Sequence, residues 1–360
     1  MTVENEQESD FFATNPAPKN LPQISAKLHE FLEFHQENGN LNKKKIVLVT
    51  SGGTTVPLEN NTVRFIDNFS AGTRGSLSAE YFLNNGYLVI FLHREFSLLP
   101  FLNHFGNINF LDLLQIENDG QKLGLDKNKV SKLNSDHNLL KVLKNYKYHT
   151  ANRNYLSISF TTINEYLFTL RAISEDLKNF YEEKNFRILI YLAAAVSDFF
   201  IPQSELPEHK IQSNLAILED PQYQQSQNPE AKQIEISSST NGKLKLNLDP
   251  VPKFLKTIVD RWYNNSFIIS FKLETDDGLL IKKCKQALAR YDHQLVIGNL
   301  LQSRKEKVVF VNKNIDQQGY KEDWFKLKEN EILDGVQIES IFIPELIKLH
   351  DNWIDHFESK

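Results

Sequence analysis

Short apolar runs recur along the 360-residue chain and alternate with amphipathic stretches. The first run, residues 46–50, is rich in β-branched residues, as is typical of a strand buried on both faces of a parallel sheet. Residues 79–83 then show apolar positions at helical spacing before Gly86, and residues 87–92 are apolar again. Strand, helix and strand at this spacing predict a βαβ unit and therefore a parallel sheet.

The same patterns predict the remaining elements. Further strands are expected at 155–160, 188–193, 267–271, 295–297 and 308–311, with 324–327 as a candidate partner of the last. Helices are expected from Ser25, over 139–146, after the Thr162–Glu165 capping box, and over 252–262, 278–291 and 344–357. Two alternating segments, 234–237 and 244–248, flank Asn241-Gly242 and predict a hairpin.

The length allows one large domain or two modest ones. We expect an N-terminal arm and helix over 1–43, with 1–20 as a polar arm, followed by a single α/β domain over 44–360. That domain is a three-layer, Rossmann-like, mainly parallel sheet with an antiparallel portion. Residues 93–160 form an insertion, and the polar segment 202–232 forms a mobile loop.

Composition excludes several classes of protein. The net charge of −5 argues against a nucleic-acid binder. The single cysteine, Cys284, excludes an internal disulfide, a multi-cysteine zinc site and a Cys-x-x-Cys redox pair. The longest apolar run, 188–196, is too short to span a membrane, and the acidic N-terminus does not resemble a signal peptide. We therefore expect a cytoplasmic protein with small-molecule ligands.

Two glycine-containing loops follow the first predicted strand. Ser51-Gly52-Gly53-Thr54 comes directly after it, at the end where open α/β sheets place ligands, and Ser70–Gly75, which includes Arg74, opens the next helix. Glycine lets backbone N–H groups approach an anion, and a helix N-terminus favours phosphate. The loops predict a phosphorylated ligand or nucleotide. Each glycine also has a structural interpretation, as a tight turn or as close packing of helix on sheet.

Further candidate residues lie before the second glycine loop, at other predicted strand ends and at the head of the polar segment 202–232. The candidates are Arg64, Asn68, Ala194, Ala195, Asp198, Lys210, Phe271 and Asn299. Arginine grips phosphate or carboxylate, a lysine in a loop offsets charge on a polyphosphate, and phenylalanine stacks on a base. Taken singly, each residue has an ordinary interpretation as a surface, cap or core residue.

As an ordered set, these segments resemble phosphopantothenate–cysteine ligase in its monofunctional eukaryotic form. The matching segments are 50–54, 63–72, 192–199, 207–213 and 267–276, together with Asn299. They keep the family's order over most of residues 44–345.

The resemblance implies an enzyme that ligates 4′-phosphopantothenate to cysteine in coenzyme A biosynthesis. ATP would activate the carboxylate as an acyl-adenylate, with Mg²⁺ or a similar divalent cation, and cysteine would then release AMP. The protein would be a homodimer through residues 93–160, in contact with other coenzyme A biosynthesis enzymes but with no nucleic acid and no membrane. No metal ligand is identified.

The resemblance also assigns roles to residues. Asn68 and Lys210 match the catalytic positions, and Arg64 matches an arginine that reaches the partner subunit's site. The nucleotide site is matched by Gly52, Ser70, Gly72, Gly75, Phe271 and Asn299. The phosphopantothenate site is matched by Asn68, Ala194, Ala195 and Asp198, with Arg64 as a further substrate-binding residue.

Two departures from the bacterial, fused relatives favour ATP over CTP. Gln212 and Ser213 stand where those relatives have further lysines, and the segment 271–274 also differs. Two alternative functions stay open from the residues alone. One is a Rossmann-like nucleotide-dependent oxidoreductase, against which the missing Gly-x-Gly-x-x-Gly counts. The other is a non-catalytic subunit of a coenzyme A-synthesising complex, against which Asn68 and Lys210 count.

Overall fold

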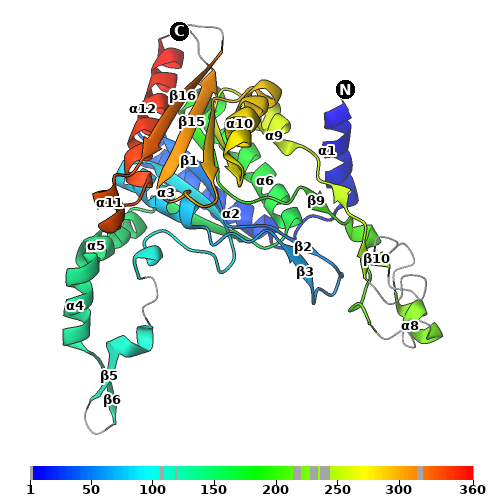
Figure 1. The fold of residues 1–360 in the computed structure, drawn as a ribbon, viewed down its shortest axis with the longest axis horizontal. Coiled ribbons are helices and arrows are strands. Elements are labelled where there is room, and N and C mark those ends of the chain that lie inside the picture. Colours follow the sequence, from blue (N-terminus) through cyan, green and yellow to red (C-terminus); the bar gives the residue numbers. More distant parts are fainter. Residues whose placement is uncertain are drawn as a thin grey trace.

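A computed structural model describes residues 3–105, 109–117, 120–213, 220–227, 234–235, 244–313 and 319–359. An eight-stranded sheet runs through its centre (Figure 1). The strands are β1 (Ile46–Ser51), β4 (Leu88–Arg94), β7 (Tyr155–Phe160), β8 (Ile188–Leu192), β13 (Phe267–Glu274), β14 (Leu295–Leu300), β15 (Lys307–Lys313) and β16 (Tyr320–Lys326).

Strand order defines the architecture. The sheet runs β16-β15-β14-β13-β8-β1-β4-β7, and the six strands from β14 to β7 are parallel. In chain order these six strands read 6-5-4-1-2-3, which is the doubly wound order. The last two strands, β15 and β16, pair antiparallel, as expected for residues 308–311 and 324–327. The predicted mainly parallel sheet with an antiparallel portion is thus confirmed.

Helices cover both faces of the sheet. On one face lie α2 (Leu21–Glu37), α6 (Ile163–Tyr181), α9 (Phe254–Thr257), the π-helix Ile258–Trp262 and α10 (Asp277–Tyr291). On the other lie α3 (Thr73–Asn84), α5 (Leu139–Ala151) and α12 (Glu339–Glu358). Alternate residues of each central strand enter the two cores, as in β1, where Leu48 faces α2 and Val49 faces α3.

The N-terminal segment differs from the expected polar arm. Residues Val3–Thr14 form helix α1, and buried Phe11 packs its ring 5.2 Å from Phe200 and 5.4 Å from Phe254. Buried Glu8 accepts a hydrogen bond of 3.0 Å from the Thr257 hydroxyl and pairs with Arg261. These tertiary contacts stabilise a helix that the polar sequence of this segment does not predict.

Phe11→Ala is expected to lower the free energy of unfolding by about 3 kcal/mol, because it leaves a cavity among packed rings. Leu333→Ala is the control, since Leu333 is exposed on α11 (Glu329–Leu333) and its truncation should cost less than about 0.5 kcal/mol. Urea unfolding monitored by circular dichroism measures both. Equal midpoints for the two variants would show that α1 does not contribute to the core.

The insertion projects from the sheet as one of two protrusions (Figure 1). It contains the 3₁₀ turns Leu102–Phe105 and Phe110–Leu113, the hairpin β5 (Leu114–Glu117) and β6 (Lys122–Leu125), α4 (Lys127–His137) and α5. The other protrusion carries α8 (Pro221–Ser226) and the pair β10 (Ile234–Glu235) and β11 (Lys245–Leu246). The expected 234–248 hairpin is therefore present, and its Asn241-Gly242 turn lies outside the described residues.

Several boundaries differ from the expected ones. Helix α2 begins at Leu21, with Pro22 in its first turn, and not after Ser25. Helix α12 begins at Glu339 and contains Pro344 within its first two turns. Within the predicted loop 202–232, the described residues include α8 and the 3₁₀ turn Gln203–Glu205. Among the helices of the described residues, none is both long and apolar enough to cross a membrane.

Candidate active site

The site lies where strand order reverses, between β1 and β8. In doubly wound sheets this switch point opens a crevice outside the carboxyl ends of the strands. The loops after the two strands are joined there by backbone hydrogen bonds, since Ala195 N–H donates to the Gly52 carbonyl at 2.8 Å and Thr54 N–H donates to the Ala195 carbonyl at 3.0 Å. The structure thus brings together Gly52, Ala194 and Ala195, which the sequence analysis had assigned from segments more than a hundred residues apart.

The second glycine loop packs against the first. Gly72 precedes α3 with φ +79°, a left-handed conformation that favours glycine, and its carbonyl accepts a hydrogen bond of 3.1 Å from Ser51 Oγ. The Ser70 hydroxyl lies beside this turn and accepts weakly from Gly72 N–H at 3.4 Å. The N-terminus of α3 therefore faces the end of β1, which is a suitable place for a phosphate group.

Gly75→Ala is expected to raise the KM for the nucleotide about tenfold or more while the fold is retained. A Cβ at Gly75 would lie 2.4 Å from Ser51 Oγ and 2.5 Å from Ser51 Cβ, so α3 must move away from β1. Gly278→Ala is the matched control in the first turn of α10, because its Cβ would approach only Asp276 Oδ1, at 3.4 Å. Steady-state kinetics with varied nucleotide distinguish them, and an unchanged KM in Gly75→Ala would remove α3 from the binding site.

Asn68 is held at the same junction. Its N–H donates to the Thr54 carbonyl at 3.2 Å, and a Cβ at Gly53 would come within 1.6 Å of the Asn68 carbonyl oxygen. Only glycine at position 53 allows this close approach. These backbone contacts hold half-buried Asn68 beside Gly53, which is bridged to Ala195.

Phe271 and Asn299 lie on the sheet face that α3 covers. Phe271 stands two strands from β1, with its ring 5.0 Å from that of Tyr191 in a T-shaped contact. Asn299 is buried one strand farther, on the same face as Ile297. Strand spacing puts them roughly 10 and 14 Å from β1 across the sheet. That span suits a nucleotide whose phosphates lie at the glycine loops and whose base lies near Phe271.

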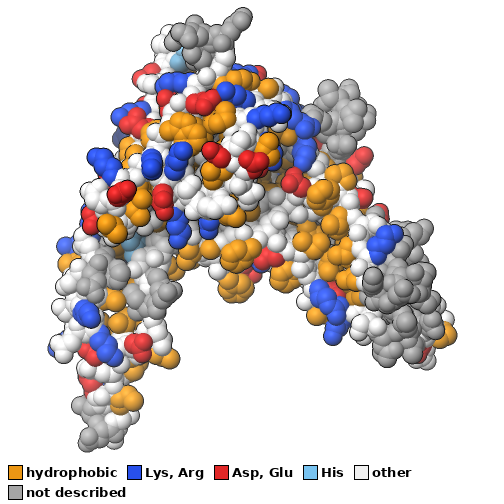
Figure 2. Space-filling view, viewed as in Figure 1, with side chains coloured by type: hydrophobic (Ala, Val, Ile, Leu, Met, Phe, Trp, Pro, Cys, Tyr) orange, Lys and Arg blue, Asp and Glu red, His pale blue; other side chains and the backbone are white. Residues whose placement is uncertain are grey.

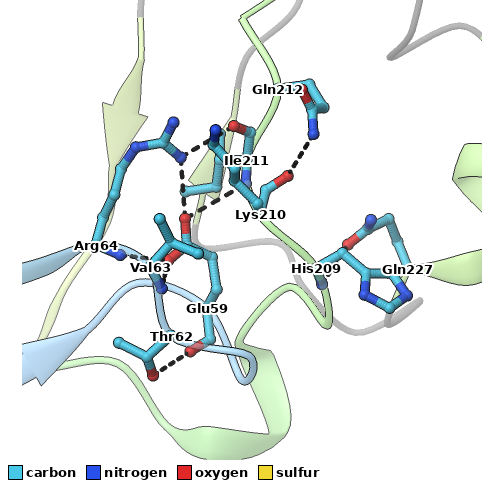
Figure 3. A network of polar contacts seen from close by, with 9 residues as sticks. All are labelled: Glu59, Thr62, Val63, Arg64, His209, Lys210, Ile211, Gln212 and Gln227. Carbon is cyan, nitrogen blue, oxygen red and sulfur yellow. Dashed lines mark hydrogen bonds and ion pairs between the residues drawn. The ribbon is translucent and has the colours of Figure 1, made fainter.

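Arg64 and Lys210 lie together at a different end of the site. In the short hairpin of β2 (Thr55–Pro57) and β3 (Phe65–Asp67), β3 separates Arg64 from Asn68 by about 13 Å along an extended strand. The Arg64 Nη1 donates to the carbonyl of Ile211, the residue after Lys210, at 2.9 Å (Figure 3). The structure therefore places Arg64 beside the backbone that carries Lys210.

Asp198 has a partner that sequence analysis missed. Lys253 Nζ lies 2.9 Å from Asp198 Oδ1, because β9 (Phe199–Phe200) pairs with β12 (Asp249–Pro250) and carries the two side chains together. Asp198 is 74% exposed, so its carboxylate lies at the mouth of the site rather than inside it. A lone lysine after a proline carries no sequence signal for this contact.

Arg74, in the second glycine loop, is engaged elsewhere. Its Nη1 lies 2.5 Å from Oε1 of Glu339, at the start of α12, and its other guanidinium nitrogen donates to the Arg304 carbonyl. Burial raises the pKa of Glu339, and the adjacent Arg74 opposes that rise. Arg74 therefore ties the glycine loop to the C-terminal helix.

We examined the described residues for a nucleophilic cysteine and for a group of metal-binding side chains. Burial raises the pKa of the Cys284 thiol to about 12, so this cysteine stays protonated and is a poor nucleophile. No group of three or more His, Cys, Asp or Glu side chains in the described part of the chain could hold a metal ion. The site is built mainly from backbone N–H groups, amides and cations.

A doubly wound sheet with glycine loops at its switch point defines an α/β protein of the Rossmann-like class. Comparisons with known proteins identify the family. The chain is 46% identical over 356 residues to phosphopantothenate–cysteine ligase CAB2 of Saccharomyces cerevisiae, covering 98% of this chain and 88% of that protein. It is 38% identical to phosphopantothenate–cysteine ligase of Homo sapiens, covering 86% and 88%. No family model matches the chain.

Solved structures agree. A histidine-to-alanine variant of Cab2 superimposes with a TM-score of 0.79 at 45% identity, covering 97% of this chain and 99% of the other. The complex of such a variant with phosphopantothenate-cysteine gives 0.78 at the same identity and coverage. The chain therefore belongs to the phosphopantothenate–cysteine ligase family.

Proposed function

We propose that this protein joins 4′-phosphopantothenate to cysteine with ATP, in the cytosol, as a step of coenzyme A biosynthesis. The carboxylate of phosphopantothenate attacks the α-phosphate of ATP and displaces pyrophosphate. The cysteine amine then attacks the acyl carbon of the acyl-adenylate and releases AMP. The observation that carries the proposal is the near full-length identity of 46% to a ligase of this name.

The positions of the candidate residues support separate binding regions for the nucleotide and for phosphopantothenate. The N-terminus of α3, with Gly52, Ser70, Gly72 and Gly75, offers N–H groups to the nucleotide phosphates, and Phe271 and Asn299 lie where the base and ribose would extend. Asn68, Ala194, Ala195 and Asp198 border the adjoining end of the crevice, where the carboxylate would meet the α-phosphate. Both half-reactions then need positioned substrates and offset charge, and no side-chain nucleophile.

A divalent cation fits this site as part of the nucleotide. Mg²⁺ keeps several waters and binds through phosphates and one or two carboxylates, and the described residues offer no carboxylate cluster. We propose that Mg²⁺ enters with ATP and reduces the charge of its phosphates. The protein's own contribution to that charge comes from Lys210 and the N–H groups of the loops.

We further propose that two copies of the chain associate through the insertion. Its apolar side chains are exposed in the single chain, including those of Phe110, Leu111, Ile116, Leu123, Leu125, Leu140, Leu143 and Tyr148. Exposed apolar surface of this extent is typical of an interface. Figure 2 shows a recess between the two protrusions, with apolar side chains along its edge. Other coenzyme A biosynthesis enzymes are further candidate partners.

Release of pyrophosphate on mixing ATP, phosphopantothenate and cysteine tests the reaction. The wild-type protein should release pyrophosphate and form phosphopantothenoylcysteine in equal amounts, with ATP preferred to CTP. An oxidoreductase or a non-catalytic subunit would form neither product. Absence of both pyrophosphate and phosphopantothenoylcysteine would contradict the proposed function.

Lys210→Gln is expected to impair the first half-reaction about 10²-fold without loss of stability, because an exposed loop lysine supplies charge and not packing. Exchange of labelled pyrophosphate into ATP, in the presence of phosphopantothenate, measures that step alone. Lys245→Gln, an exposed lysine at the hairpin β10–β11, is the control and should exchange normally. Wild-type exchange in Lys210→Gln would remove this lysine from the mechanism.

A further inference from the structure

Glu59 is a fully buried carboxylate that none of the sequence motifs singled out. It follows β2 by two residues, and its side chain has no exposed surface. Burial of a carboxylate is costly unless its oxygens accept hydrogen bonds. Each oxygen of Glu59 accepts two, and they come from Val63 N–H at 3.2 Å, Arg64 N–H at 2.9 Å, Arg64 Nη1 at 3.0 Å and Ile211 N–H at 3.3 Å.

These four donors come from two segments far apart in sequence. Oε2 accepts from residues 63 and 64, and Oε1 accepts from the Arg64 guanidinium and from Ile211. Figure 3 shows Glu59 between Arg64 and the Lys210–Ile211 segment. One carboxylate therefore fixes the side chain of one candidate site residue and the backbone next to another.

Other contacts join the same segments without touching either candidate side chain. Asn60 N–H donates to the Pro207 carbonyl at 2.9 Å and Asn61 N–H donates to the Glu208 carbonyl at 3.1 Å. The amide groups of both asparagines also donate to the Glu208 carboxylate. These contacts already hold the two loops together. Glu59 is therefore not needed for that purpose alone.

The charges of the neighbouring side chains indicate what Glu59 contributes. Arg64 and Lys210 are cations on adjoining segments, and a carboxylate beside the Arg64 guanidinium offsets their repulsion. The Arg64 side chain is still 42% exposed, and both of its contacts with Glu59 and Ile211 run through Nη1. The guanidinium is thus oriented from one edge while the rest of it faces outward, as recognition of a phosphate requires.

We propose that Glu59 is a positioning residue that makes Arg64 and Lys210 one anion-binding unit, serving a single active site. The proposal rests on the proposed function, because it takes Arg64 and Lys210 as binders of the phosphorylated substrates. Glu59 touches neither substrate and acts through these two residues. Its effect should therefore fall on formation of the acyl-adenylate and not on attack by cysteine.

Glu59→Gln is the test, because it keeps the shape and replaces one acceptor oxygen with an NH₂ group facing N–H donors. Pyrophosphate–ATP exchange should fall about 10²-fold, since a small misplacement of a binding group has effects of that size. Reaction of preformed acyl-adenylate with cysteine should stay within about twofold of wild type. Amide exchange at Ile211 N–H, measured by mass spectrometry or NMR, should become faster.

Glu165→Gln is the matched control. Glu165 is a partly buried carboxylate that accepts from Thr161 N–H at 2.7 Å and Thr162 N–H at 3.1 Å at the start of α6. The change from carboxylate to amide is the same, but both bonds go to one oxygen, which the amide of glutamine keeps, so Glu165→Gln should retain both half-reactions. If Glu59→Gln unfolds, Glu59→Asp keeps the charge with a shorter reach and should show a smaller loss in exchange alone.

A second comparison separates positioning from general support. If Glu59 acts through Arg64, Glu59→Gln should add little to the loss already caused by Arg64→Ala. Equal losses in both half-reactions, full additivity with Arg64→Ala, or unchanged pyrophosphate exchange would each overturn the proposal. A wild-type protein that forms no product would instead contradict the proposed function, and exchange at Ile211 would still report whether Glu59 holds this segment.

Discussion

Asn68→Asp is expected to form acyl-adenylate and then stall. The substitution is isosteric, and the residue is held through its backbone at Thr54 and Gly53, so the fold should be unaffected. The asparagine amide can donate to the acyl-adenylate, whereas an aspartate carboxylate repels its phosphate. Pyrophosphate should appear in an amount equal to the enzyme, while release of phosphopantothenoylcysteine falls about 10²-fold or more.

Quenched-flow separation of the products measures this uncoupling. Asn20→Asp, at the exposed start of α2, is the control and should carry out both half-reactions normally. Normal amide formation by Asn68→Asp would contradict the role assigned to Asn68. Loss of the first half-reaction as well would place this residue in activation rather than in transfer.

Mixed dimers of Arg64→Ala and Asn68→Asp should recover activity that neither variant has alone. Arg64 lies about 13 Å from Asn68 along β3, so the two need not serve the same site within one chain. If Arg64 acts in the partner's site, a mixed dimer has one site with both residues intact and one with neither. Random pairing makes half of the dimers mixed, so about a quarter of wild-type activity should return.

The experiment consists of unfolding the two variants together, refolding them, and confirming mixed dimers by native mass spectrometry. Recovery to a quarter supports action between subunits. No recovery despite confirmed mixed dimers means that Arg64 acts within its own chain. Arg64→Ala mixed with Lys210→Gln is the companion control, because residues that form one unit cannot complement each other from different chains.

The carboxyl ends of the strands were the most predictable part of the site. Gly52, Ala194, Phe271 and Asn299 follow apolar runs whose strands are parallel neighbours, so the rule that ligands bind at those ends placed them together. β7, Tyr155–Phe160, has the bounds that its alternation predicted. In both cases the prediction rests on a few consecutive residues, because burial of a strand determines which of its positions are apolar.

The contacts of Glu59 and Lys253 could not be predicted in this way. Each is one charged residue in a polar stretch. The contacts from Glu59 to Ile211 and from Lys253 to Asp198 join segments more than fifty residues apart. Helix α1 was missed because its polar sequence is stabilised by a few aromatic contacts rather than by a repeated apolar stripe. The strands β2 and β3 have three residues each, too few to show a period.

The position of β1 in the sheet bears on how the chain folds as the ribosome makes it. β1 lies between β4 and β8; β4 and β7 emerge early, whereas β8 begins only at Ile188. Until then one edge of β1 is unpaired and open to pairing with another chain. Asn299 follows after roughly 10 s more of synthesis. If nucleotide binds as proposed, the nascent chain therefore gains no stability from it until Asn299 has been made.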